Sequence, residues 1–529
     1  MTRIKCYLIS LFLGIILQSN AQAPNYVTIF SNSFGGSLNE DFFAGAPYSD
    51  GGWLLTGFTN SIDGDIDSLV AYDTTNILVV KCNSLGVKEW AKTFGGNAYD
   101  KARYVMEDMD GNILVVGGTY SVDGDIDTTH GNSEYFILKL DPLGNKIWMK
   151  QYGGTGYEGG RFITQYPNGD YFVAGYTTSH NGDFAVNRGL HDGLLMRVDV
   201  DGNFIWSNTY GGTDEDRMRS YVETPDGGYL YFGSSNSNDL QVSGAHGGAD
   251  YWVGKVDSVG NPQWSKLYGG SLDELAYHIT ATADGNYLLT GATYSNDGDV
   301  TGFKGGTDGW LVKIDSVGNL LWQQCYGGSL FDRLNRSFEN SDGKIMSFGF
   351  AQSSDFDLTG DNVGPSQNFW LTQLDSAHNI EWNYCTGGTN TDLGEDIFFN
   401  PADSSFILMG DSKSSNGAMV INHGDYDFSI LKIAVLTSSI NELKGHSQFE
   451  SFYDNSTETL VIKSETESLI DLVVTDVMGK LISKRNAIKI IPGKNSVTIP
   501  ELADVANGTY NMQLRSAGGI STLRFVSIH

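Results

Sequence analysis

The amino-acid sequence predicts an all-β protein: a seven-bladed β-propeller with four-stranded blades, followed by a small β-sandwich. Three observations support this prediction. Gly-Gly pairs begin at 35, 95, 153, 211, 269, 327 and 387, so the sequence repeats every 58 or 60 residues. Each repeat contains four short apolar runs, and the last repeat lacks its fourth run. Repeats of this length and content are typical of propellers. A linear solenoid is the alternative, but it leaves the incomplete last repeat unexplained.

One repeat shows the four runs clearly. They are ELAYHITAT (274–282), YLLTGAT (287–293), DGWLVKID (308–315) and LLWQQCYGG (320–328). An Asp-Gly pair separates the first two runs, which is a strong hairpin signal because both turn residues need positive φ. No helical period competes with this pattern. Each repeat is therefore predicted to fold into four antiparallel strands.

The two ends of the repeat array predict how the ring closes. The repeat from Asp392 offers three strands and no tryptophan-bearing fourth strand, whereas NYVTIFSNSFGG at 25–36 resembles a fourth strand with nothing before it. We expect this segment to complete the last blade and to remove the open sheet edge. The predicted organisation is a signal peptide at 1–23, the propeller at 24–435, a linker at 436–448 and a C-terminal domain at 449–529.

The repeated phrase WSKLYGG predicts a joint between blades. Trp264 and Tyr268 are four residues apart, so on a strand they point to the same face. Large aromatic side chains can fill the wedge-shaped gap between neighbouring blades. Gly269-Gly270 would then let the chain turn sharply from the outer rim toward the centre of the next blade.

An acidic residue follows five positions after the first glycine of every pair. These residues are Glu40, Asp100, Glu158, Asp216, Glu274, Asp332 and Asp392. We expect each carboxylate to accept backbone N–H groups from its own turn, as in Asx-turns. The alternative is a ring of carboxylates that holds a cation at one mouth of the channel.

Further series recur around the third strand and are also predicted to be structural, with pairing across strands. The strand itself carries Lys81, Lys139, Arg197, Lys255, Lys313, Gln373 and Lys432. Five residues earlier lie Asn76, Glu134, Asp192, Asp250, Asp308, Asn368 and Asp427. Equivalent loop positions hold His130, Arg188, His246, Lys304 and His423, which indicates a turn element rather than a shared metal site.

The long loops between second and third strands contain the best candidates for a metal site. The sequences SIDGDIDS and SVDGDIDT place carboxylates at alternate positions, as in the first half of a calcium loop. The predicted ligands are Asp63, Asp65, Asp67, Asp123, Asp125, Asp127 and Glu134. Thr128 stands where such a loop needs glycine, so this is not a proper EF-hand. The alternative is solvated Asx-turn loops without calcium.

Charge and motifs narrow the possible functions. The net charge is −30, and such a surface repels nucleic acid and anionic lipid headgroups while it suits cations. There is no Gly-x-Ser-x-Gly elbow, phosphate loop or His-Glu-x-x-His motif, so no residue is assigned a catalytic role. Cys82, Cys325 and Cys385 show no metal-type spacing, and equivalent positions in a repeat lie too far apart to bridge. We therefore interpret them as packing residues.

The two ends of the chain predict export. A basic start, an apolar run of about a dozen residues and Ala21-Gln22-Ala23 have the pattern of a secretory signal peptide. No other stretch is long and apolar enough to span a membrane. Residues 440–529 differ in composition, and their alternating apolar runs predict the small β-sandwich. Its characteristic motifs are Phe452-Tyr453-Asp454-Asn455-Ser456, Asp476-Val477-Met478-Gly479-Lys480 and Leu502 through Gly508-Thr509-Tyr510.

These motifs resemble the C-terminal sorting domain of proteins exported by the type IX secretion system of the Bacteroidetes. The usual Tyr-Pro-Asn-Pro start of that family lacks its prolines here. The resemblance implies recognition by the type IX machinery, export through the outer membrane, and either release or surface attachment. The repeats resemble a propeller family that is common in such secreted proteins and has no established chemistry. Fold alone does not imply function.

The sequence therefore predicts a secreted or cell-surface protein for binding or adhesion, not an enzyme. Its ligand would be a glycan or a protein, held by the face that carries the long loops. A structural surface protein without a discrete ligand and a polysaccharide-degrading propeller enzyme are the alternatives. Calcium is the one cofactor considered. Neither a nucleic-acid partner nor a transmembrane segment in the mature chain is expected.

Overall fold

The structure is a computed structural model, and it describes most of the propeller and part of the C-terminal region. The described residues are 26–66, 74–127, 130–184, 186–359, 365–401, 403–419, 421–435, 449–454, 459–464, 467–476, 481–499, 508–516 and 519–527. The predicted signal peptide and linker therefore lie outside them, as do parts of the sorting motifs. Across these ranges, no helix is long and apolar enough to cross a membrane.

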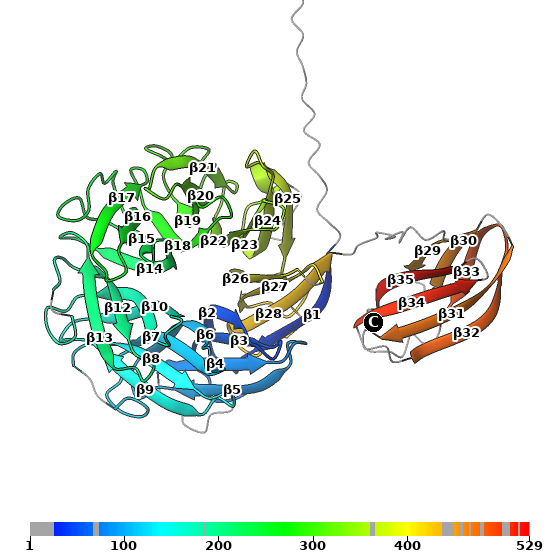
Figure 1. Ribbon diagram of the computed structural model, residues 1–529, viewed down its shortest axis with the longest axis horizontal. Coiled ribbons are helices and arrows are strands. Elements are labelled where there is room, and N and C mark those ends of the chain that lie inside the picture. Colours follow the sequence, from blue (N-terminus) through cyan, green and yellow to red (C-terminus); the bar gives the residue numbers. More distant parts are fainter. Residues whose placement is uncertain are drawn as a thin grey trace, which may run out of the picture. The chain divides into compact units, whose positions relative to one another are not determined.

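Seven four-stranded antiparallel sheets account for the described repeats (Figure 1). We call them blades 1 to 7. Blades 1 to 3 contain β2 (Glu40–Pro47), β3 (Trp53–Thr59), β4 (Asn76–Cys82) and β5 (Lys88–Phe94); β6 (Asp100–Glu107), β7 (Ile113–Thr119), β8 (Glu134–Leu140) and β9 (Lys146–Tyr152); and β10 (Glu158–Gln165), β11 (Tyr171–Thr177), β12 (Asp192–Val198) and β13 (Phe204–Tyr210).

The remaining blades follow the same order. Blades 4 to 6 contain β14 (Asp216–Glu223), β15 (Tyr229–Ser235), β16 (Asp250–Val256) and β17 (Pro262–Tyr268); β18 (Glu274–Ala281), β19 (Tyr287–Thr293), β20 (Asp308–Ile314) and β21 (Leu320–Tyr326); and β22 (Asp332–Glu339), β23 (Ile345–Ala351), β24 (Asn368–Leu374) and β25 (Ile380–Thr386). A short 3-10 helix, η1 (Phe356–Leu358), lies in the long loop of blade 6.

Blade 7 confirms the predicted closure. It contains β26 (Asp392–Asn400), β27 (Ser405–Ser412), β28 (Asp427–Val435) and β1 (Tyr26–Phe34). β1 pairs with β28 as the fourth strand of this sheet. The contacts within the chain divide it into two compact units. The first consists mostly of Asn32–Ile397 and Leu408–Ile430, and the second includes Leu431–His529. The division passes through blade 7.

The first strand of each blade lies nearest the centre of the ring, and the fourth lies at its rim (Figure 1). The middle strands are buried on both faces; every residue of β4, β16 and β19 is buried. Trp252, Trp310 and Trp370 occupy equivalent third-strand positions and are fully buried. Because a buried indole N–H needs an acceptor, Trp310 Nε1 donates to Gln323 Oε1 at 2.7 Å, a contact that recurs in blades 4 and 6.

The predicted joint between blades is confirmed. The Tyr268 hydroxyl donates to the carbonyl of Gly318, in the next blade's turn, at 2.5 Å. Trp264 packs on the same turn, because a β-carbon on Gly318 would lie 2.8 Å from its indole ring. The same hydroxyl contact links Tyr152 to Gly202 at 2.5 Å.

The C-terminal strands form two further sheets, as the predicted sandwich requires. One contains β29 (Phe449–Asp454), β30 (Thr459–Ser464) and β33 (Gly493–Thr498), and the other β31 (Ser468–Asp476), β32 (Leu481–Ile490), β34 (Gly508–Ser516) and β35 (Gly519–Ser527). Leu460 and Ile462 of one sheet share a buried core with Leu472, Val474 and Met512 of the other.

Candidate functional site

The inner strands surround a channel, and six of them carry a β-bulge at the same place. In β2, β6, β10, β14, β18 and β22 the pairing register breaks at the fourth residue. The bulged residues are Phe43, Arg103, Arg161, Arg219, Tyr277 and Asn335. A bulge re-aims side chains locally, and here both the bulged residue and the one after it line the channel.

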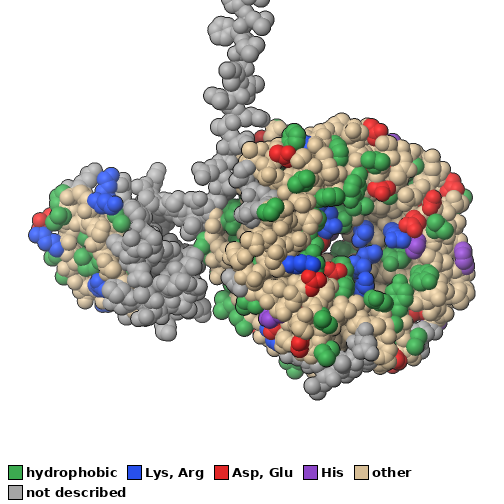
Figure 2. All heavy atoms as spheres, turned by 180° about the vertical axis from the view of Figure 1, so that it is seen from behind, with side chains coloured by type: hydrophobic (Ala, Val, Ile, Leu, Met, Phe, Trp, Pro, Cys, Tyr) green, Lys and Arg blue, Asp and Glu red, His purple; other side chains and the backbone are tan. Residues whose placement is uncertain are grey.

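A cavity of about 290 Å³ lies in this channel. The bulged residues line it together with Arg333, Arg336, Glu395 and Asp396. Figure 2 shows lysine and arginine side chains gathered around the hollow at the centre of the ring. The channel therefore has the opposite charge to the protein as a whole, whose net charge is −30.

Arg103, Arg161 and Arg219 form a cationic arc on the successive inner strands β6, β10 and β14. Among the described residues, none of the three guanidinium groups forms an ion pair with a carboxylate. Burial, and then repulsion from Arg219, lowers the pKa of Arg103 to about 10. Burial and repulsion from Arg103 also hold the pKa of Arg161 well below its usual value. These lowered pKa values indicate that nearby acids do not fully compensate the positive charges of the two guanidinium groups.

Aromatic rings support the arc. The guanidinium carbon of Arg103 lies 3.8 Å from the centroid of the Phe43 ring, and that of Arg161 lies 5.4 Å from the Tyr176 ring. Such contacts attract a cation through the ring quadrupole. They orient the guanidinium groups without neutralising them, so their N–H groups stay available to a ligand.

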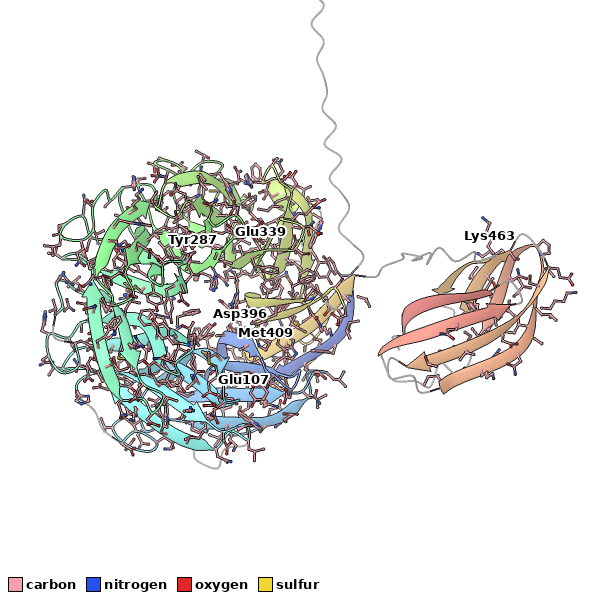
Figure 3. All side chains as sticks on the ribbon, in the orientation of Figure 1. Glu107, Tyr287, Glu339, Asp396, Met409 and Lys463 are labelled. Atoms are coloured by element: carbon pink, nitrogen blue, oxygen red, sulfur yellow. The ribbon has the colours of Figure 1, made fainter. Side chains whose placement is uncertain are left out.

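On the other side of the channel, the charges are paired. Arg333 forms an ion pair of 2.6 Å with Glu395, and Arg336 pairs with Asp396, which lies on β26 beside the central opening (Figure 3). Asn335 Nδ2 donates to Glu395 Oε2 at 2.8 Å. Burial nevertheless raises the pKa of Glu395 to about 6.

Two more carboxyl groups near the channel have raised pKa values. Burial, and then the charge of Asp41, raises the pKa of Asp411 well above its usual value. Asp411 Oδ1 accepts the backbone N–H of Phe42 at 2.5 Å. Burial raises the pKa of Asp41 as well. The charges of Arg103 and Lys101 oppose this rise, so Asp41 lies within electrostatic range of the arc.

One end of the channel lies on the face of the long loops, because antiparallel strands place the start of the first strand beside the end of the second. Lys101, Arg217 and Arg333 are the second residues of their inner strands and lie nearest this mouth. Exposed aromatic side chains also occur on this face, including Tyr99, Tyr120, Tyr157 and Phe331. The rings of Tyr120 and Tyr157 are 6.3 Å apart.

The seven repeated acids behave as predicted for turn residues. Each accepts the N–H of the second glycine of its pair, as in Gly270 N to Glu274 Oε2 at 2.9 Å and Gly328 N to Asp332 Oδ2 at 2.7 Å. All seven are buried, each inside its own joint. The structure therefore does not bring them together as a ring at the channel mouth.

The third-strand cations pair with the acid of the first hairpin turn in their own blade. Lys81 contacts Asp50 at 2.5 Å, and Lys313 contacts Asp284 at 2.7 Å. The same pairing joins Lys139 to Asp108, Arg197 to Asp170, Lys255 to Asp226 and Lys432 to Asp403. These contacts confirm the structural interpretation. The three cysteines are buried and unbridged, as packing residues should be.

The predicted calcium ligands lie in two different blades, and their contacts are those of capped turns. Asp63 Oδ1 accepts the N–H of Ser37 at 2.8 Å, and Asp123 Oδ1 accepts that of Asn97 at 2.8 Å. Asp125 forms an ion pair of 2.7 Å with Lys146.

The other candidates are likewise engaged or lie at the edge of the described chain. Asp65 lies 3.4 Å from Lys88, and Glu134 accepts the N–H of His130 at 2.6 Å. Asp127 is exposed, and Asp67 lies outside the described residues. In the described part of the chain, no group of three or more His, Cys, Asp or Glu is placed to hold a metal ion. Calcium binding by these loops stays a prediction.

Sequence reasoning missed the arginine arc. A signal was present: the repeated acids keep one residue type across the blades, whereas the residue three positions later is Phe43, Arg103, Arg161, Arg219, Tyr277, Asn335 and Glu395 in turn. A position that breaks the symmetry of a repeat array is where a site is expected. The bulge that turns these side chains inward could not be inferred from the sequence pattern.

The fold and its repeated joints define a repeat propeller protein. No protein-family model matches the chain. It is 24% identical over 352 residues to an uncharacterized WD repeat-containing protein of Acanthamoeba polyphaga mimivirus, covering 57% of this chain and 23% of that protein. It is 23% identical over 276 residues to the regulatory protein FlaEY of Caulobacter vibrioides, covering 47% and 29%. The chain thus spans about a quarter of the length of these curated relatives.

Among solved structures, puromycin hydrolase superposes with a TM-score of 0.43 at 11% identity, covering 84% of this chain and 62% of that one. The α-L-arabinofuranosidase of Fusarium graminearum superposes with a TM-score of 0.34 at 11% identity, covering 76% and 97%. Likeness at this level concerns the fold and carries no assignment of activity.

Proposed function

We propose that this propeller is an exported binding protein that takes a small anionic ligand in its channel. The observation that supports this is the arc of Arg103, Arg161 and Arg219, which carries no ion pair among the described residues. A half-buried charge without a partner is costly to keep. Guanidinium groups bind carboxylates through paired hydrogen bonds, so an anionic ligand would supply the missing partner.

The size of the cavity and the net charge of the protein indicate that the part of the ligand inside the channel is a small anion. The cavity of about 290 Å³ is at the lower limit of ligand pockets and suits a single sugar-sized group. The net charge of −30 repels nucleic acids and long polyanions. A ligand that enters the channel would therefore carry one or two negative charges.

The polar and aromatic lining favours a carboxylated sugar. The buried Oδ1 of Asn335 has no hydrogen-bond partner and would accept a bond from a ligand hydroxyl. Phe162 and Tyr277 also line the cavity, and such aromatic side chains can pack against the C–H groups of a sugar. Exposed Tyr120 and Tyr157 outside the mouth would contact further residues of a glycan. This deepens the predicted role in binding or adhesion through the loop face.

Calorimetric titration with glucuronate, galacturonate, a short oligogalacturonide and neutral glucose tests this proposal. We expect the acids to bind and glucose not to bind. In R161Q the Kd should rise about tenfold or more, because a charge-assisted hydrogen bond contributes about 1.5–3 kcal/mol. R197Q is the matched control, since Arg197 pairs with Asp170 in a hairpin turn outside the cavity lining. Failure of every acid to bind, or unchanged binding in R161Q, would reject it.

A hydrolytic enzyme is the second candidate, and Glu395 is the observation that favours it. Its pKa is raised to about 6 by burial, as suits a general acid. Both of its oxygens are engaged, however, by Arg333 and Asn335. If the protein is a hydrolase, it should release reducing sugar from acidic polysaccharides, and E395Q should lose this activity. If wild type and E395Q are equally inactive while binding persists, the binding role stands.

The site of action we propose is outside the cell or on its surface, after export by the type IX route. The signal-peptide pattern and the sorting motifs support this. Removal of residues 449–529 should leave the propeller in the periplasm, because the recognition signal is gone. Cell fractionation with antibody against the propeller measures this, and unchanged export of the truncated protein would contradict it. If the protein has a structural surface role without a ligand, the full chain should still be exported, and no ligand should give binding heat in calorimetric titration.

A further inference from the structure

Each joint between blades brings two side-chain oxygens together beside the first glycine of the Gly-Gly pair. At Gly269, a β-carbon would lie 2.1 Å from Asp250 Oδ1 and 2.2 Å from Glu274 Oε2. At Gly35 the corresponding atoms are Asp427 Oδ1 at 2.4 Å and Glu40 Oε2 at 2.5 Å. The glycine is therefore required because the two carboxyl groups occupy the place of a side chain.

Five joints contain two acids, and two contain an acid and an amide. The acid pairs are Asp427 with Glu40, Glu134 with Glu158, Asp192 with Asp216, Asp250 with Glu274, and Asp308 with Asp332. In the remaining joints, Asn76 faces Asp100 and Asn368 faces Asp392. An amide is the neutral isostere of a protonated carboxyl group, so one member of the pair is uncharged in these two joints.

In four of the five acid pairs, the third-strand acid has a buried oxygen that lacks a donor. The side chains of Asp192, Asp250, Asp308 and Asp427 are fully buried. In each of them Oδ1 has no hydrogen-bond partner. Two buried carboxylates cannot both stay charged at close range without a positive species between them. The chemistry therefore requires either a cation or a proton at this point.

A metal ion fits this point poorly. Calcium needs six to eight oxygen ligands, and magnesium needs six. Each joint offers two facing side chains, and no larger metal-binding group of acids, histidines or cysteines is found in the described ranges. The first-strand acid of each pair already accepts bonds from the protein; Asp332 Oδ2, for example, accepts Gly328 N and the Ser353 hydroxyl at 2.7 and 2.5 Å.

We propose that each of the four acid pairs with such an unpartnered oxygen binds one proton, which its two carboxyl groups share in a hydrogen bond inside the joint. In mildly acidic solution the protein then carries fewer negative charges than its sequence indicates. Release of this proton leaves two negative charges in a buried joint and weakens the contact between neighbouring blades. The propeller is thereby built to hold its ring most firmly in mildly acidic surroundings.

The pKa shifts agree with this geometry. Burial, and then the charge of Asp250, raises the pKa of Glu274 to about 7. Burial raises the pKa of Asp308 to about 7, with the charges of Asp332 and Asp357 acting in the same direction and Lys304 opposing them.

The groups that face the pairs differ between joints. His130, His246 and His423 place Nδ1 near the first acid, at 3.2, 3.3 and 2.7 Å. Arg188 takes this place beside Asp192 at 3.2 Å. The joint of Asp308 and Asp332 contains no histidine, and its cation Lys304 is paired with Asp357 at 2.9 Å. This joint therefore gives the clearest test.

The first experiment compares thermal unfolding of the wild type and D308N from pH 5 to pH 9. Asparagine already stands at this position in two native joints, so we expect the variant to fold. The Tm of D308N should equal that of wild type at pH 5 and exceed it increasingly above pH 6, because only wild type acquires a second buried charge. D201N removes an exposed carboxylate and should follow wild type at every pH. A constant difference between D308N and wild type would overturn the proposal.

The second experiment detects the protons directly in the wild-type protein. Infrared spectroscopy at pH 7 should show the C=O stretch of protonated carboxyl groups, and this band should vanish at pH 9 or on unfolding. Its absence at pH 7 would overturn the proposal. The alternative is that a metal ion, not a proton, lies between the two carboxyl groups. Elemental analysis after dialysis against a chelator tests it, and a metal ion retained in a stoichiometric amount would overturn the proposal.

Discussion

Which residue type a position of this propeller tolerates depends on neighbours from other parts of the chain. Gly269 shows this clearly, since its own turn does not require positive φ, yet two carboxyl oxygens leave no room for a β-carbon. Gly118 lies on β7, the second strand of blade 2, where a β-carbon would meet its nearest atom at an ordinary 3.4 Å. The same residue type is thus indispensable at one position and replaceable at the other.

G269A should destabilise the protein, because the added methyl group must displace Asp250 or Glu274. We expect a loss of about 1–3 kcal/mol in the free energy of unfolding, the usual cost of overpacking. Urea denaturation with a fluorescence readout measures it. G118A is the matched control and should lose less than about 1 kcal/mol; equal losses in both variants would contradict the steric explanation.

At the scale of elements, the fourth strand holds each blade to the next. Tyr152 at the end of β9 is buried, and its hydroxyl donates to the carbonyl of Gly202, in the turn between β12 and β13. This contact depends on the aromatic residue of one repeat and on the turn of the following one. It explains why both the tryptophan-bearing strand and the glycine-containing turn recur throughout the array.

Y152F should cost about 0.5–1.5 kcal/mol of unfolding free energy, because it removes this hydrogen bond and leaves a carbonyl without its donor. Chemical denaturation measures the change. Tyr157 is half-exposed on the loop face, and Y157F should be nearly neutral. A neutral Y152F would show that the hydroxyl contact adds nothing to the joint.

At the scale of the molecule, the acidic residues fall into two groups with opposite pH behaviour. In the joints, burial raises carboxyl pKa values, as for Asp216 and Asp427 to about 6. In the hairpin turns, the lysine of the third strand holds the pKa of Asp226 below its usual value. The first group favours folding in its protonated form and the second in its charged form.

These shifts predict a stability maximum in mildly acidic solution. A raised pKa contributes stability that is fully present below the unfolded value of about 4 and is lost as pH rises to about 7. A lowered pKa contributes stability that is present above about 4 and is lost as pH falls further. Urea midpoints from pH 3 to pH 8 should therefore peak near pH 4–5. A midpoint that rises steadily from pH 5 to pH 8 would contradict this prediction.

The sequence by itself determined the fold class, the repeat and the ring closure. Strand-length apolar runs, Asp-Gly turns and a divided last repeat are local signals, and the contacts of Tyr268 and β1 confirm what they predicted. The symmetric acids were also predictable as turn residues, because a capped turn is formed within a few residues of the chain.

Only the tertiary structure decided the candidate site. Arg103, Arg161 and Arg219 lie 58 residues apart in sequence, and no local pattern brings them together. Their convergence requires a closed ring of inner strands and a bulge in each that turns the side chain inward. The acid pairs in the joints have the same origin, because Asp308 and Asp332 belong to adjacent blades. Local signals predict the strands, whereas the closure of the ring determines which charged groups must share one buried space.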